Sequence, residues 1–292
     1  MDEADWQRLT SQLRRGDCTP FLGAGACVGA LPTGTELSTR YAIEHGYPFT
    51  DDHNLARVMQ YAAAELRDSV DLKTRVCEYL QECGRTRSAG PNDPHAVLAR
   101  FPLDTFLTTN YDNFLAEALR RRGKQPTEEV SAWWEGGSTD VPVVATPDWE
   151  KPLVYYLHGS WAMPRSLVLT EADYLNYLVN MVDASAYTGR FPLPTPVLRA
   201  LTMKPLLFLG YSLQDWTFRV LFHGLARSTP RSNHRRHVSV QIMPGVNDSA
   251  TDVEAKAERY LAHYLHGWNI STFFGTATDF CAELEARTRD LS

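Results

Sequence analysis

Two polar side chains directly follow apolar runs of the sequence, at positions where they could take part in catalysis. His158 follows the run "LVYYL" (153–157), and Asn110 follows "FLTT" (106–109). A neutral imidazole can accept a hydroxyl proton, and a carboxamide can both donate to and accept from a water molecule. Each residue also has a structural interpretation, because Asn110 could cap a helix and a lone histidine at a strand end is often structural. Their joint occurrence at two strand ends favours a site that combines a base with a positioned water.

Glycines follow two further apolar runs, in "FLGAGA" (21–26) and "FLGYSL" (208–213). Gly23 and Gly25 could let the backbone approach a phosphate group, with amides of the turn and of the next helix as donors. A simple tight turn is an equally open interpretation. The spacing Gly23, Gly25, Gly29 is one residue longer than G-x-G-x-x-G, and no acidic residue clearly ends a second strand about 20 residues later, which disfavours a dinucleotide dehydrogenase. The sequence also lacks the P-loop and nucleophile-elbow motifs.

Short apolar strands alternate with amphipathic helices along most of the sequence. This pattern predicts an α/β fold, a Rossmann-like parallel sheet with helices on both faces. A helical stretch at about 40–100 interrupts it, so we expect one domain over 1–292, with core segments at about 1–40 and 100–292. Because the carboxyl ends of parallel strands share one edge, the four motif ends should lie together. Expected strands lie within 18–26, 104–110, 141–146, 153–158, 205–210, 237–243 and 269–274.

Composition excludes several classes of function. The chain is 43% hydrophobic and 22% charged, as in soluble globular proteins, and its net charge of -6 gives no reason to expect nucleic-acid or membrane binding. It has no apolar run long enough to span a membrane, and its N-terminus is unlike a secretory signal. The five cysteines are scattered, without a Cys-x-x-Cys pair, so we expect reduced thiols, a cytoplasmic protein and no metal site. His95, near a predicted helix start, is expected to be structural.

In their order along the chain, these motifs resemble the sirtuin-like NAD-hydrolase domains of bacterial anti-phage defence systems. The resemblance covers about residues 18–285. It rests on "GAGA" (23–26), "TTNYD" (108–112), "LHGS" (157–160) and "LGYSL" (209–213), supported by "PHAVLARF" (94–101) and "LVLTEADY" (167–174).

The resemblance implies that NAD is the substrate and is cleaved to nicotinamide and ADP-ribose, without a metal. NAD would lie between the sheet and the helical layer, with Asn110 positioning a water and His158 acting as base on the ribose hydroxyls. Asp112 would help to hold the nicotinamide amide. The other cofactor-binding positions that the resemblance implies are Gly23, Ala24, Gly25 and Ala26 at the phosphates, Gly210 and Ser212 at the phosphates or adenosine ribose, and Thr276 near adenine.

The chain departs from the protein deacetylases of the same family. Those enzymes carry two Cys-x-x-Cys pairs that bind zinc, and this sequence has neither pair. It reads "ALPTGTEL" after the glycine turn in place of an Ile-Pro-Asp-Phe-like stretch, and no Asn follows "HVSVQIM". Two alternatives to an NAD hydrolase remain: a sirtuin-like module that senses a nucleotide without cleaving it, and a protein deacylase or ADP-ribosyl transferase. A pure sensor would need neither Asn110 nor His158.

Unregulated cleavage of NAD would be toxic, so control is expected from a homo-oligomer or a separate regulatory partner. The resemblance suggests a helicase-like ATPase or a short Argonaute as that partner. Trp133 and Trp134 are adjacent in a polar loop, where paired tryptophans are unlikely to stay in water. They could fold back onto the core, anchor an interface or form a lid.

Overall fold

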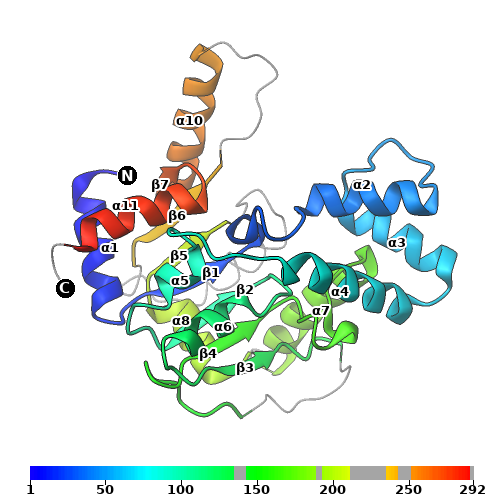
Figure 1. Cartoon of the computed structure of the whole chain (residues 1–292), viewed down its shortest axis with the longest axis horizontal. Helices are drawn as coiled ribbons and strands as arrows, with labels where there is room; N and C mark the ends of the chain where they lie inside the picture. Colours follow the sequence, from blue (N-terminus) through cyan, green and yellow to red (C-terminus); the bar gives the residue numbers. More distant parts are fainter. Residues whose placement is uncertain (135–142, 189–192, 211–234, 243–250, 290–292) are drawn as a thin grey trace.

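A parallel sheet of seven short strands organises the part of the chain that the structure describes (Figure 1). This computed structural model describes residues 1–134, 143–188, 193–210, 235–242 and 251–289. The strand order β3-β4-β2-β1-β5-β6-β7, with every neighbouring pair parallel, confirms the predicted α/β fold. The strands are β1 (Thr19–Leu22), β2 (Thr105–Thr108), β3 (Thr127–Val130), β4 (Leu153–Tyr156), β5 (Leu206–Leu209), β6 (His237–Gln241) and β7 (Ile270–Phe274).

The four central strands are buried on both faces, which explains why their sequences are continuous apolar runs. Strand β1 lies between β2 and β5, so the chain fills one side of the sheet before crossing to the other. Such a reversal of strand order leaves a crevice outside the carboxyl ends of the strands. Phe21 is in register with Leu107 and with Phe208, and Leu107 with Tyr155, so the ends of the four motif strands meet at one edge as predicted.

The prediction for the strand next to β4 was wrong. A strand was expected at 141–146, but residues 143–146 are not in a strand and Val143 is fully exposed. The strand is instead β3, in which Thr127 pairs with Leu153 and Val130 with Tyr156. Its sequence, "TEEV", is polar and partly exposed, as an edge strand permits, so no apolar pattern marks it.

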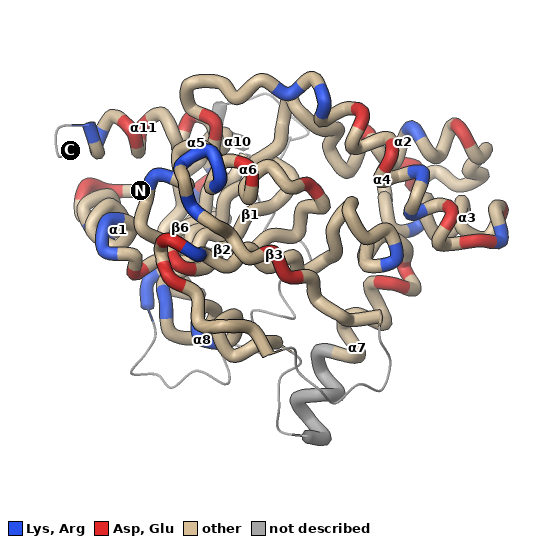
Figure 2. Tube along the Cα trace, turned by 60° about the horizontal axis from the view of Figure 1, so that its bottom comes forward, with Lys and Arg blue, Asp and Glu red and all other residues tan. Residues whose placement is uncertain are grey.

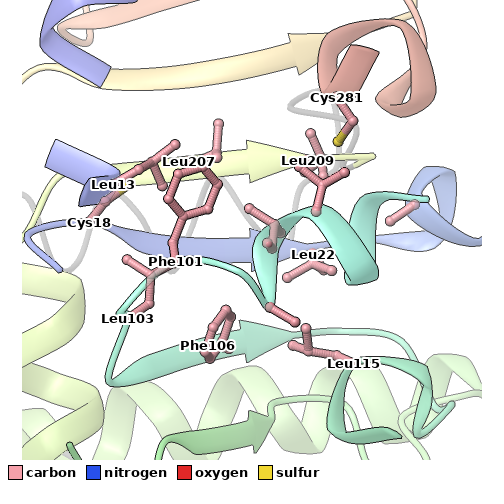
Figure 3. Packing of buried hydrophobic residues seen from close by; sticks show 14 of the residues in the cluster. Leu13, Cys18, Leu22, Phe101, Leu103, Phe106, Leu115, Leu207, Leu209 and Cys281 are labelled. Atoms are coloured by element: carbon pink, nitrogen blue, oxygen red, sulfur yellow. The ribbon is translucent and has the colours of Figure 1, made fainter. Parts of the chain in front are cut away.

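Helices cover both faces of the sheet. On one face, α1 (Glu3–Arg14), α5 (Pro94–Leu98), α6 (Phe114–Arg121) and α11 (Ala277–Arg289) pack into a core with alternate strand residues. Figure 3 shows part of this core, where Leu22 and Leu209 meet Leu115 and Cys281. On the other face, Phe21 and Phe208 pack with α8 (Thr195–Met203) and with Leu265 of α10 (Thr251–His266). The alternation of Phe21 and Leu22 between the two cores follows from the twofold period of a strand.

A separate helical layer lies beside the sheet (Figure 1). It contains α2 (Gly34–His45), α3 (Leu55–Leu66) and α4 (Ser69–Arg85), and these pack around their own core with Leu167 and Leu169. Helix α2 begins with a capping box between Thr33 and Glu36. Helix α7 (Glu171–Thr188) is joined to the layer through the buried ion pair of Lys73 with Asp173 (2.8 Å). The remaining short helices are η1 (Ala24–Cys27) and η2 (Pro164–Ser166).

Charged residues of both signs are interspersed along the described helices (Figure 2). This mixture accords with the small net charge of -6. None of the helices in the described ranges has the length and apolar character needed to cross a membrane.

Candidate active site

A cavity of about 630 Å³ opens at the carboxyl edge of the sheet, between the strand ends and the helical layer. Six of the predicted site residues line it: Ala24, Gly25, Asn110, Asp112, His158 and Gly210. The helical side of the cavity is mostly apolar and includes Leu37, Leu55 and Leu80. The structure therefore brings together residues from the ends of four different strands, and apolar side chains of the helical layer face them across the cavity.

The two glycine turns of the motifs pack directly against each other. The Gly25 amide donates to the Gly210 carbonyl oxygen over 2.8 Å. A Cβ on Gly25 would lie 2.7 Å from Gly210 Cα, and a Cβ on Gly210 would lie 2.1 Å from the Ala26 amide nitrogen. Gly210 also has a φ of +70°, which favours glycine. This backbone contact explains why both positions lack a side chain. Ala26 packs into the core and does not line the cavity.

Asn110 is held by two acceptors in the glycine turn. Its Nδ2 donates to the Gly23 carbonyl oxygen (3.0 Å) and to Cys27 Sγ (3.2 Å). A carbonyl oxygen can only accept, so the amide nitrogen of Asn110 must face Gly23. The carboxamide oxygen is then the atom that Asn110 can offer to a ligand in the cavity.

The side chain of Asp112, and not that of Asn110, bonds the first backbone amide of the helix that follows. Its Oδ1 accepts from the Phe114 backbone amide (3.0 Å) at the start of α6, and its Oδ2 accepts from the Cys27 thiol (3.1 Å). The interpretation of Asn110 as a helix cap was therefore wrong, and its side chain lines the cavity instead. Burial, together with the neighbouring Asp112 carboxylate, raises the pKa of Cys27 well above its usual range, so this thiol is protonated and donates.

His158 lies two residues beyond the end of β4, in a turn that contacts with the following segment hold in place. The His158 carbonyl oxygen accepts from the Val168 amide (2.9 Å), and Gly159 has a φ of +95° with no room for a Cβ beside Ser166. The His158 ring stands edge-on to two tyrosines, with ring centroids 5.7 Å from Tyr174 and 5.1 Å from Tyr177. Tyr174 also lines the cavity, although the sequence marked it only as part of a supporting motif.

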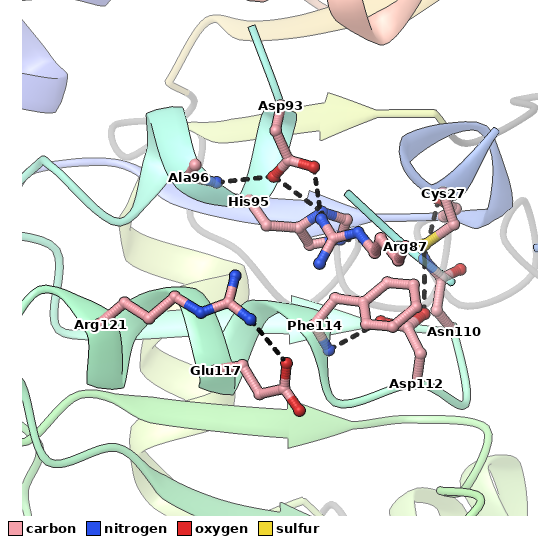
Figure 4. A network of polar contacts seen from close by, with 11 residues as sticks. Cys27, Arg87, Asp93, His95, Ala96, Asn110, Asp112, Phe114, Glu117 and Arg121 are labelled. Carbon is pink, nitrogen blue, oxygen red and sulfur yellow. Dashed lines mark hydrogen bonds and ion pairs between the residues drawn. The ribbon is translucent and has the colours of Figure 1, made fainter. Parts of the chain in front are cut away.

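Behind Asn110 and Asp112 lies a buried polar network (Figure 4). His95 Nε2 is 3.8 Å from Cys27 Sγ, and its Nδ1 is 2.9 Å from an Arg87 nitrogen. Arg87 is also paired with Asp93. Burial alone would raise the pKa of Asp93, but the adjacent His95 ring, the Ala96 amide and the charge of Arg87 hold that pKa well below its usual range. The interpretation of His95 as structural agrees with its place in this network, while Cys27 was not singled out from the sequence.

Three other predicted positions lie outside the cavity lining or the described residues. Gly23 is not in the lining, although its carbonyl oxygen holds Asn110. Thr276 is exposed, and its hydroxyl and amide bond Asp279 at the start of α11, although its neighbours Gly275 and Ala277 line the cavity. Ser212 lies outside the described residues. Trp133 folds back onto the core, where its indole nitrogen donates to the Ser166 carbonyl oxygen (2.7 Å), and Trp134 packs edge-on against it.

A doubly wound parallel sheet with a cavity at the reversal of strand order defines a class of α/β proteins that bind ligands at that edge. Residues 104–273 match the SIR2-like domain family, and the chain belongs to this family. This assignment confirms the predicted sirtuin-like relationship.

Curated relatives share one name. The chain is similar to proteins named NAD(+) hydrolase ThsA from Acinetobacter baumannii (27% identical over 212 residues, 71% of this chain and 39% of that protein) and Enterococcus faecium (27% over 236 residues, 80% and 45%). A third, from Bacillus cereus, is 24% identical over 235 residues, 78% of this chain and 44% of that protein. The chain thus spans less than half the length of these relatives.

Proposed function

We propose that this chain hydrolyses NAD at the bond between nicotinamide and ribose, releasing nicotinamide and ADP-ribose, and that it depletes NAD in defence against phage. The observation that carries the proposal is that Asn110 and His158 line one cavity together with the paired glycine turns. The name shared by the relatives, NAD(+) hydrolase, supports the same substrate.

The cavity offers each part of NAD a suitable surface. The pyrophosphate is assigned to Ala24, Gly25 and Gly210, the small residues of the two turns that line the cavity. The adenosine end then points toward Gly275 and Ala277, and the nicotinamide toward Asp112.

The chemistry asks for positioning rather than strong acid catalysis. The nicotinamide ring of NAD is already cationic, so it takes the bonding electrons and leaves as a neutral molecule without protonation. An oxocarbenium-like ribose results, and a water oxygen bonds to its anomeric carbon and then gives up a proton. The Asn110 carboxamide oxygen accepts a hydrogen bond from that water, which aims the water oxygen at the ribose. His158 takes a proton from a ribose hydroxyl, which helps to stabilise the cation, and returns it once the water has added. The proton lost by the water is then the one released to solvent.

We also propose that activity depends on assembly into a homo-oligomer or on a separate regulatory protein, because uncontrolled loss of NAD would harm the host cell. The resemblance leaves a helicase-like ATPase or a short Argonaute as the partner.

The direct test is to incubate the purified protein with NAD and to quantify nicotinamide and ADP-ribose. Equal amounts of the two products are expected. NAD binding without either product would instead support the sensor alternative. ADP-ribose found attached to protein, or removal of an acyl group from a peptide, would support the transferase or deacylase alternative.

A further inference from the structure

Three side chains from separate parts of the chain form a compact group beneath the NAD cavity. Cys27 belongs to η1, His95 to α5, and Asp112 to the turn before α6. Each is almost fully buried, and their potential ligand atoms all lie within 4.8 Å of one another. Cys27 Sγ is 3.1 Å from Asp112 Oδ2 and 3.8 Å from His95 Nε2 (Figure 4).

These atoms match the preferences of zinc in type and spacing. Thiolate, imidazole and carboxylate are the protein ligands of zinc, with metal–ligand distances of about 2.0 to 2.3 Å. In a tetrahedral site the ligand atoms are therefore about 3 to 4 Å apart, close to the separations around Cys27. Three protein ligands leave the fourth position open, and Cys27 and Asp112 both line the cavity.

The surroundings can support a bound cation. Asp93 Oδ1 lies 3.5 Å from His95 Nδ1, and a carboxylate behind a ligating histidine is common at metal sites. Arg87 donates to the same Nδ1, so ion binding must break the contact between Arg87 and His95. The ion pair of Arg87 with Asp93 can remain. Binding must release the Cys27 thiol proton to solvent. The resulting thiolate and the Asp112 carboxylate then neutralise a divalent ion, which avoids an uncompensated buried charge.

We propose that Cys27, His95 and Asp112 bind a divalent zinc-type ion and that the bound ion inhibits the enzyme. The inhibitory part rests on the proposed function, because the ion would occupy Asp112 at the nicotinamide end of the cavity. The binding part does not depend on it. Spacing along the sequence could not reveal this group, since its members lie 68 and 85 residues apart from Cys27.

The binding test is a titration of the purified full chain with Co²⁺, followed by absorption spectroscopy. One cobalt per chain is expected, with a thiolate-to-cobalt charge-transfer band and visible bands of a four-coordinate site. The charge-transfer band should vanish in Cys27→Ser and persist in Cys83→Ser, a control at a more exposed thiol. Absence of the band in the unmodified protein, or its persistence in Cys27→Ser, would overturn the site.

The inhibition test compares NAD cleavage with and without Zn²⁺ within each variant. Zinc at saturating concentration should slow the parent protein and Cys83→Ser by about tenfold or more at low NAD, with recovery on adding a chelator. The ratio of the two rates should move toward one in Cys27→Ser. Cobalt binding without any NAD cleavage would contradict the proposed function and leave the metal site standing. NAD cleavage that zinc does not slow would contradict the proposed inhibition.

Discussion

At the scale of single residues, the Asn110 carboxamide has a fixed orientation. Gly23 and Cys27 accept from its nitrogen, so its oxygen is the group presented to a ligand. His158 is fixed differently, by a backbone hydrogen bond to Val168 and by ring contacts with Tyr174 and Tyr177. The two proposed catalytic groups are thus positioned before substrate binds.

Tyr174 should act as a positioning residue for His158. Tyr174→Ala removes the ring that borders the imidazole and should lower kcat by about tenfold with a smaller change in KM, because orientation carries much of the rate. Tyr174→Phe keeps the ring and should stay within a few-fold of the parent. Steady-state kinetics of both variants checks this, and equal losses in both would show that the ring contact is unimportant.

The meeting of Asn110 and His158 in one cavity was predictable because each follows an apolar run that forms a strand, and the carboxyl ends of parallel strands meet. Cys27 was not predictable, since nothing in the sequence shows that the turn after β1 lies against Asn110 and Asp112. Thr276 was expected near adenine, but its side chain bonds Asp279 at a helix start, a pattern that the sequence "TATD" contains. Local capping competes with ligand binding for the same hydroxyl.

At the scale of elements, the contact between the turns after β1 and β5 fixes the phosphate end of the cavity. Gly210 and Gly46 both have positive φ, at +70° and +62°, but only Gly210 has backbone where a Cβ would stand. Gly46→Ala should therefore cost about 1 kcal/mol of unfolding free energy from backbone strain alone.

Gly210→Ala adds an overlap that neither turn can relieve and should cost about 3 kcal/mol or more. It should also weaken NAD binding, because the cavity is deformed. Denaturant unfolding of the two variants measures the difference, and equal destabilisation would mean that the turns do not pack as described.

The edge strand β3 shows where sequence patterns fail at this scale. Central strands such as β4 and β5 are apolar because both faces are covered. An edge strand carries no such requirement, so the polar "TEEV" was not recognised as a strand. The strand expected at 141–146 is absent over 143–146, the part of it that lies within the described residues.

Helix α1 is joined to strand β7 through Asp5, and this link should be pH-dependent. Burial alone would raise the pKa of Asp5, but hydrogen bonds from Arg8 and Ser271 lower it below the ordinary value. A carboxyl with a lowered folded-state pKa stabilises the fold above the unfolded value of about 3.9, and the effect is lost as pH falls through the folded pKa.

Asp5→Asn should therefore be less stable than the parent at neutral pH. The difference in unfolding free energy between the two proteins should become smaller as the pH is lowered. Thermal unfolding of both proteins across this range tests it. Exposed Glu65→Gln serves as a control for loss of a carboxylate. A gap that stays constant with pH would show that the Asp5 charge contributes nothing.

At the scale of the whole molecule, one cavity joins the sheet to the helical layer, so substrate binding depends on how the two parts meet. Leu37, Leu55 and Leu80 of the layer face the strand ends across it. A ligand that fills the cavity must stabilise both parts against separation.

Activity should also depend on assembly. Specific activity toward NAD should rise with protein concentration as the chain associates, or on adding its partner, because an always-active form would strip its own cell of NAD. Light scattering and NAD loss recorded on the same samples test this. Full specific activity that stays constant on dilution to a monomer, without a partner, would show that activity does not depend on assembly.

Asn110 and His158 are proposed to cleave NAD together, and product release by matched variants shows whether they do. At the protein concentration of highest activity, the parent should release nicotinamide and ADP-ribose in equal amounts. Asn110→Ala and His158→Ala should each be slower by about 100-fold or more while remaining folded. The controls Asn113→Ala and His53→Ala, outside the cavity lining, should match the parent. Wild-type turnover in both cavity variants would show that Asn110 and His158 are not the catalytic residues.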